Sequence, residues 1–177
     1  LVVSLAIGLF TSRIILSALG VSDYGIYNIV GGFVSMLSLF TISLSGATSR
    51  FITFELGRGD MERMKKTFAT LSTLVYLLAV IVLILGETVG LWFVKEYLVI
   101  PDERWKAALF VYHCSLLAFI VNLIALPYNS CVIAHEKMNF FAIVSVLDSV
   151  LKLGIVYMLY ISPFDRLRTY AVLLVAI

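Results

Sequence analysis

The stretch that decides the fold is TFATLSTLVYLLAVIVLILGETVGLWFV, residues 67–94. It carries one charged side chain, Glu87, over more than the ~20 apolar residues that a transmembrane helix needs. Similar apolar segments lie at 1–19, 24–46, 105–132 and 139–161, and a sixth opens at 170–177. Short polar links separate them. The pattern predicts an all-α, polytopic bundle of transmembrane helices without a soluble domain.

The composition of the whole chain supports this prediction. Of its 177 residues, 62% are hydrophobic and 14% are charged, against roughly 45–50% and about 25% in soluble domains. A chain of this length has too small a core to hide so much apolar surface from water. An ordinary cytosolic enzyme, a disordered chain and a disulfide-rich secreted domain are therefore excluded, and a net charge of +2 gives no reason to expect a nucleic-acid partner.

The ends and the links give expectations about topology. Because apolar runs stand at both ends, we expect a piece of a longer membrane protein, truncated at each end. The most basic link, between Thr48 and Lys66, favours a cytoplasmic position for that link and for the N-terminus. Within it, Asp60 resembles the start of a helix.

Small and polar side chains recur at helical spacing in two segments. Asn122 and Asn129 share one such face of segment 105–132, and Asn28 shares another in segment 24–46 with Ser35 and Ser38. Two interpretations stay open. Such seams can be sites of close helix packing, which membrane interfaces favour, or they can line a hydrated cavity.

Four charged residues fall inside the apolar segments: Arg13, Glu87, Asp148 and Lys152. A charge at the bilayer centre costs roughly 2.5–3.5 kcal/mol on insertion scales, so such residues face a bundle interior, pair or line a water-filled path. Asp148 and Lys152 are four residues apart and could form a structural ion pair, whereas Arg13 and Glu87 could extend toward an interface. Together they favour a polar interior.

Signals for catalysis are weak. His113 has no acidic or metal-binding neighbour at helical spacing, and the pair Asp102-Glu103 is typical of a helix start. No phosphate-binding loop, zinc motif or nucleophile motif occurs in the sequence. We therefore expect no enzyme, no catalytic residue, no metal site and no cofactor.

Several short stretches resemble one family of transporters. They are Ser12–Gly20, SRIILSALG, followed by Asp23–Tyr27, DYGIY; Ser49–Phe51, SRF, followed by Glu55–Asp60, ELGRGD; and Pro127-Tyr128 with Ala134–Met138, AHEKM. On these stretches the chain resembles the bacterial polysaccharide-biosynthesis transporters, the O-antigen and capsule flippases of the MOP superfamily, which are related to MATE exporters. The resemblance extends over essentially the whole chain.

The resemblance implies that the chain is the first six-helix lobe of a MATE-like flippase of 12–14 helices in the bacterial inner membrane. Such a protein flips undecaprenyl-diphosphate-linked oligosaccharide by alternating access, for lipopolysaccharide O-antigen, capsule or exopolysaccharide synthesis. Arg13 would then lie against the diphosphate. On their chemistry alone, Asp148 and Lys152 are candidates for coupling to H⁺ or Na⁺, with Glu87 as a further cavity residue.

Membrane lipid and, as a further option, the polysaccharide assembly machinery would be its partners. Alternatives are a MATE-type drug/cation antiporter, an integral-membrane glycosyltransferase or polymerase, and a structural assembly subunit.

Overall fold

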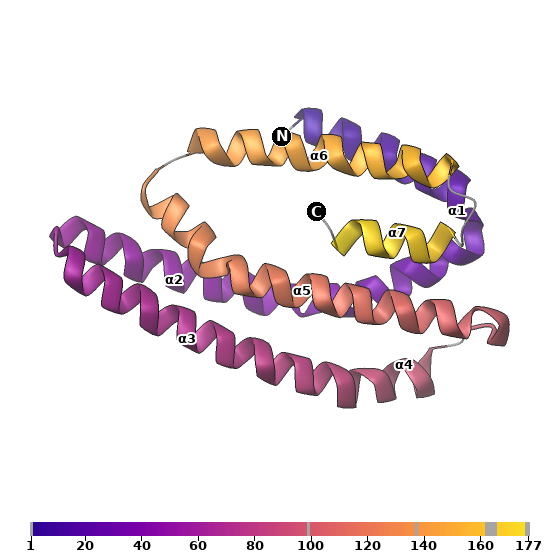
Figure 1. Ribbon diagram of the computed structural model, residues 1–177, viewed down its shortest axis with the longest axis horizontal. Coiled ribbons are helices and arrows are strands. Elements are labelled where there is room, and N and C mark those ends of the chain that lie inside the picture. The colour runs from indigo at the N-terminus through magenta and orange to yellow at the C-terminus, as the bar shows by residue number, and fades with distance from the viewer. Residues whose placement is uncertain (1, 99, 137, 162–165, 176–177) are drawn as a thin grey trace. The chain divides into compact units, whose positions relative to one another are not determined.

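The computed structural model describes residues 2–98, 100–136, 138–161 and 166–175. Over these residues the chain is helical and forms no strand, which confirms the all-α prediction. The elements are α1 (Val2–Met36), α2 (Ser38–Arg58), α3 (Met61–Leu85), the π-helical turn η1 (Gly86–Gly90), α4 (Leu91–Tyr97), the 3₁₀ turn η2 (Asp102–Arg104), α5 (Trp105–Ala134), α6 (Met138–Ile161) and α7 (Arg166–Val175) (Figure 1).

These elements belong to two compact units. The first unit contains Leu1–Val34, Val99–Ala118 and Asn139–Ile177. The second contains Ser35–Leu98 and Phe119–Met138. Helix α5 therefore contributes its first half to one unit and its second half to the other. In the second unit, α2 and α3 form an antiparallel pair that Figure 1 shows side by side.

A glycine interrupts α1 where the sequence predicts a link between two helices. Gly20 has φ 80° and ψ 168°, a backbone conformation outside the helical region, and helix continues on both sides of it. Because glycine has no Cβ, it adopts positive φ without a steric penalty. The two helices predicted on either side of residues 20–23 are therefore present within α1, and the link between them is a sharp kink at Gly20.

The link expected at residues 48–66 is much shorter in the structure. Helix α2 continues to Arg58, and Gly59 ends it in the left-handed conformation, with its N–H bonded to the Leu56 carbonyl. The Asp60 side chain accepts the N–H of Arg63 at 3.0 Å, so the helix start predicted at Asp60 is found. Arg50 and Arg58, two of the charges that mark this stretch as a link in the sequence, lie on exposed positions of the continuing helix α2.

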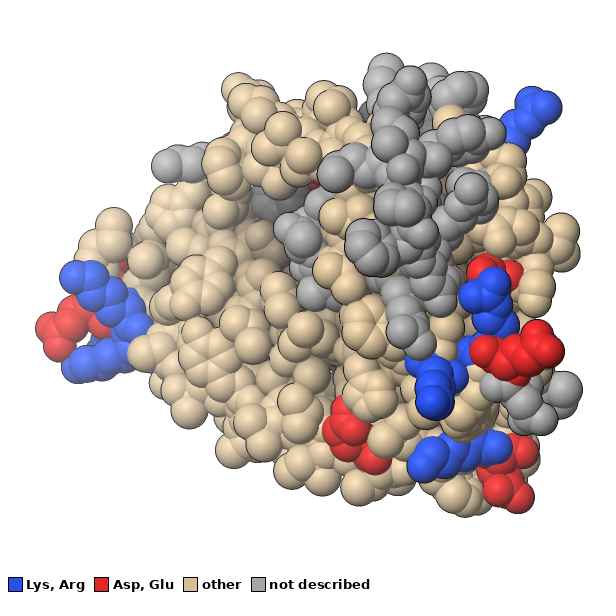
Figure 2. Space-filling view, turned by 45° about the vertical axis from the view of Figure 1, so that its right-hand side comes forward, with Lys and Arg blue, Asp and Glu red and all other residues tan. Residues whose placement is uncertain are grey.

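Three helices of the described part are long and apolar enough to cross a membrane: Leu19–Arg58, Met61–Tyr97 and Trp105–Ala134. Large apolar side chains such as Phe40, Leu77 and Leu117 are more than half exposed on them. Figure 2 shows the same property as a broad uncharged surface with charged side chains gathered at its margins. Lipid is the environment that suits such a surface, consistent with a multi-pass membrane protein. It stays a prediction that the segments at 1–19 and 139–161 also cross the membrane.

Candidate functional site

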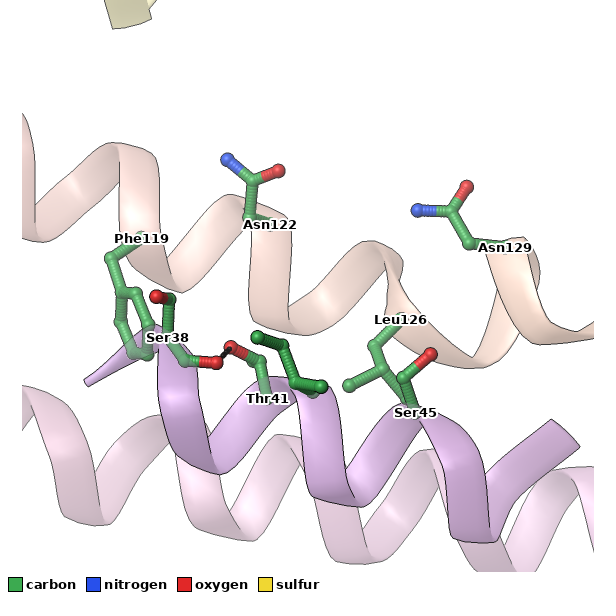
Figure 3. A pocket seen from close by; sticks show the side chains of 8 residues that line it. Ser38, Thr41, Ser45, Phe119, Asn122, Leu126 and Asn129 are labelled. Atoms are coloured by element: carbon green, nitrogen blue, oxygen red, sulfur yellow. Dashed lines mark hydrogen bonds between the residues drawn. The ribbon is translucent and has the colours of Figure 1, made fainter. Parts of the chain in front are cut away.

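The second unit contains a pocket between the first half of α2 and the second half of α5 (Figure 3). Its volume is about 460 Å³, within the range of small-molecule sites. The residues that line it are Ser38, Thr41, Ile42 and Ser45 from α2, and Phe119, Asn122, Leu126 and Asn129 from α5. Five of the eight are neutral polar residues, none is charged, and Ile42, Phe119 and Leu126 add apolar surface, so the pocket is uncharged and of mixed polarity.

Helical periodicity places these side chains. Ser38, Thr41 and Ser45 are separated by three and then four residues, which sets them on one face of α2. Asn122 and Asn129 are two turns apart and extend from the same side of α5, with their amide groups directed away from α2 (Figure 3). The two asparagines therefore share a face, as the sequence predicts.

The polar groups of the pocket can both donate and accept hydrogen bonds. The Thr41 hydroxyl donates to the Ser38 carbonyl at 2.7 Å, which leaves its lone pairs available. Each asparagine amide offers two N–H donors and a carbonyl acceptor. Between them in the sequence lies the buried Pro127, which has no N–H to donate to the carbonyl of Leu123. Such a set suits a neutral ligand rich in hydroxyl groups.

Next to the pocket lies a group of three buried hydroxyls, here called the hydroxyl layer: Thr48 of α2, Ser72 of α3 and Ser130 of α5. Their side chains are 1%, 7% and 0% exposed, and none of the three hydroxyl oxygens has a hydrogen-bond partner among the described residues. Buried polar atoms are usually satisfied, so three exceptions in one unit need an explanation.

Two independent observations place the three hydroxyls of this layer at the same level along the helices of the second unit. Because α2 and α3 meet at the turn of Gly59 and Asp60, residues equally distant from the turn lie level, as Thr48 and Ser72 do. The hydroxyls of Tyr76 and Tyr128 lie 3.1 Å apart, which brings this part of α5 to the same height. The layer therefore adjoins the end of the pocket at Ser45 and Asn129.

The other candidates from the sequence lie outside this pocket. Arg13 is exposed on α1 in the first unit and forms no ion pair within the described residues. Asn28, also in the first unit, is exposed and donates from its amide to the Tyr24 carbonyl at 2.8 Å. Glu87 is exposed in η1 of the second unit and does not line the pocket. The predicted seam of Asn28 with Ser35 and Ser38 is thus divided between the two units.

The first unit also contains ion pairs. Lys152 Nζ lies 2.9 Å from Asp148 Oδ2, with side chains 47% and 39% exposed, so the pairing that the sequence allowed is present. Arg104 Nε lies 3.3 Å from Asp23 Oδ1, and the aspartate side chain is only 8% exposed. This second pair joins the start of α5 to the segment after the Gly20 kink.

Several residues of the second unit were not predicted. Thr41, Thr48 and the partly buried Glu55 continue the face of α2 that begins at Ser38, at alternating spacings of three and four residues. That period runs through the stretch predicted as a link, so extending it would have found them. One carboxylate oxygen of Glu55, Oε2, is buried without a hydrogen-bond partner.

The remaining candidates for catalysis and metal binding are His113 and the groups of histidine, cysteine and acidic side chains. Nδ1 of His113 lies 2.6 Å from the carbonyl oxygen of Leu109, four residues earlier in the same helix. Among the described residues, no group of three or more histidine, cysteine, aspartate and glutamate side chains could hold a metal ion.

Comparison of the chain with protein-family models, with curated proteins and with solved structures finds no match.

Proposed function

We propose that this chain is part of a carrier that moves undecaprenyl-diphosphate-linked oligosaccharide across the bacterial inner membrane. The observation that carries the proposal is the pocket of the second unit, whose hydroxyl and amide groups stand within an apolar helical chain. Sugar hydroxyls need neutral donors and acceptors, and lipid supplies none. A pocket of this composition lowers the free energy of a glycan that must cross the apolar region.

The remaining parts of the cargo have matching features elsewhere in the chain. The prenyl tail is apolar and suits the exposed lipid-facing helices. The diphosphate is anionic and needs a cation, and Arg13 is a guanidinium without an ion-pair partner among the described residues. The same proposal includes transport by alternating access, coupling to H⁺ or Na⁺ and an N-terminus in the cytoplasm. It also includes a position as the first lobe of a MATE-like protein of 12–14 helices, and contact with the polysaccharide assembly machinery.

The lining of the pocket separates this function from the alternatives. A drug/cation antiporter needs a carboxylate against its cargo, and the eight residues that line the pocket include none. A membrane glycosyltransferase or polymerase needs an acidic group at its reacting centre, which the pocket likewise does not offer. Neutral hydrogen bonding is what this pocket provides.

The test uses the complete protein that contains this chain, reconstituted in proteoliposomes with labelled undecaprenyl-diphosphate oligosaccharide. The double variant Asn122→Leu/Asn129→Leu removes both amides from the pocket. We expect its translocation rate to fall by about tenfold or more, because each hydrogen bond to the glycan contributes roughly 0.5–1.5 kcal/mol. The matched control is Asn139→Leu, which alters an exposed asparagine of α6 outside the pocket.

Unchanged translocation by the folded double variant would contradict a role of the pocket in holding the glycan. If the unaltered protein moves no oligosaccharide but exports ethidium, the function is that of a cation antiporter instead. Loss of transport in the Asn139→Leu control would show that the assay reports on folding and not on the pocket.

A further inference from the structure

The outer face of α2 has a chemistry unlike that of the pocket on its inner face. Arg50, Phe54 and Arg58 follow one another at intervals of four residues, and Phe51 lies beside them on the same face. All four side chains are exposed; the two phenylalanines are 58% and 60% exposed. These four residues are here called the cationic–aromatic face.

The position of this face along the chain places it at a membrane boundary. One candidate span ends at Arg58 and the next begins at Met61, so the turn between them lies where the apolar region meets water. Aromatic and basic side chains are enriched at that depth, since rings tolerate the headgroup region and cations meet lipid phosphates there. In Figure 2 charged side chains gather at the left margin, where Figure 1 places the α2–α3 turn.

Within the described residues, the two arginines of this face have no acidic partner. Two of the three neighbouring basic residues of α3 have acidic partners: Arg63 pairs with Asp60 at 3.2 Å and Lys66 with Glu62 at 2.8 Å. The third, Lys65, is exposed. In contrast, neither Arg50 nor Arg58 forms an ion pair within the described part of the chain. Local acids therefore cancel most of the charge of α3 at the turn and leave two guanidiniums on α2, together with Lys65 of α3, for an external anion.

The geometry of Arg58 favours an anion that is joined to an apolar group. Its guanidinium carbon lies 5.5 Å from the centre of the Phe54 ring, a cation–π contact that holds the charge over an exposed aromatic surface. A phosphate bound to Arg58 would thus have an apolar surface directly beneath it. Arg50 lies two turns deeper, ~12 Å along the helix, and its long side chain can extend toward the same headgroup level.

We propose that the cationic–aromatic face binds an anionic phospholipid, with its phosphodiester at Arg58 and Arg50 and an acyl chain along Phe54 and Phe51. Charge complementarity selects the anion, and the exposed rings select a lipid over a free phosphate ion. Beyond Phe51 the same face of α2 carries Ala47, Ser43 and the exposed Phe40. The Ser43 hydroxyl donates to the Leu39 carbonyl of its own helix, so an acyl chain can continue along the helix. This inference needs only the membrane-spanning character of the helices and is independent of the transported cargo.

The test measures lipid retention by the intact protein with native mass spectrometry in detergent. The probes are phosphatidylglycerol and phosphatidylcholine with identical acyl chains. We expect tighter retention of phosphatidylglycerol, and about fivefold weaker retention for each of Arg58→Gln and Arg50→Gln. The matched control is Arg63→Gln, which removes the same charge nearby from a residue already paired with Asp60 and should change retention by less than about twofold.

Two results would overturn the proposal, and neither depends on the folding of a variant. Equal retention of the two lipids by the unaltered protein would exclude selection of an anionic headgroup. Loss of the preference on addition of millimolar glycerol phosphate would show an anion site that does not need a lipid. Among the variants, an equal effect of Arg63→Gln and Arg58→Gln would show that lipid retention depends on the net charge near the turn and not on a specific site.

Discussion

The two units treat their polar side chains differently. In the first unit, buried or partly buried charges are matched within the protein, as Asp23 with Arg104 and Asp148 with Lys152 show. In the second unit, the hydroxyls of Thr48, Ser72 and Ser130 and one carboxylate oxygen of Glu55 are buried without a partner among the described residues. Both units present apolar helices outward, so the contrast concerns only their interiors.

This difference teaches which polar groups serve the fold and which are available to a ligand. An ion pair in an apolar setting satisfies its own charges, and its loss penalises folding. A hydroxyl without a partner contributes nothing to folding and carries a desolvation penalty. The ion-paired groups of the first unit are therefore assigned to structure, and the unpaired interior groups of the second unit to binding. The predictions below test that assignment, beginning with the largest effect.

Replacing Arg104 by glutamine should destabilise the first unit most. It removes the cation from Asp23, whose side chain is 8% exposed, and leaves a buried carboxylate without that compensation. We expect a loss of about 2 kcal/mol in the free energy of unfolding, below the 3–5 kcal/mol of a fully buried pair because the arginine is partly solvated. Denaturant titration in detergent micelles measures it.

The matched variant is Asp23→Asn, which removes the other half of the pair. It should cost less, about 1 kcal/mol, because the Arg104 side chain is 43% exposed and water can solvate it. If Asp23→Asn is the more damaging of the two, the aspartate acts through contacts other than this ion pair.

Local sequence signals account for much of the fold. The apolar runs predict the helices, Gly20 marks the kink, and Asp60 marks the start of α3. The spacing of Asn122 and Asn129 places both on one face, and the pocket contains both. Each of these features depends on residues within a few turns of one another, where helical periodicity is sufficient.

Features that depend on distant residues could not be predicted in the same way. The hydroxyls of Tyr76 and Tyr128 meet across 52 positions, and Asp23 meets Arg104 from another helix. Nothing in the local spacing selects these partners. The predicted end of the helix at residue 46 is also wrong. Arg50 and Arg58 interrupt the apolar run, but they occupy an exposed face of α2, which continues through them. Membership of the flippase family stays a prediction.

Replacing Thr48 by valine should stabilise the second unit. Valine has nearly the same shape and removes a buried hydroxyl that has no partner among the described residues. We expect a gain of about 1 kcal/mol, seen as a higher midpoint of thermal unfolding. A loss of stability would show that a water molecule or a ligand satisfies the hydroxyl in the folded protein.

The control for this prediction is Thr41→Val, seven residues away on the same face of α2. The Thr41 hydroxyl donates to the Ser38 carbonyl at 2.7 Å, so its removal should cost about 0.5–1 kcal/mol. Opposite signs for the two threonine variants would separate a satisfied hydroxyl from an unsatisfied one. Equal signs would remove the distinction on which the hydroxyl layer rests.

The smallest change in stability is expected for variants of Asp148 and Lys152. These variants also give the strictest test of the assignment of ion pairs to structure. Their side chains are 39% and 47% exposed, and pairs of this kind contribute roughly 0.2–1 kcal/mol. Asp148→Asn and Lys152→Gln should each lower the unfolding midpoint slightly, and the double variant should recover part of the loss because no charge is left alone. Transport by the double variant should stay near normal. If it is as inactive as Asp148→Asn, the carboxylate carries the coupling ion, and a polar group of the first unit then serves function as well as the fold.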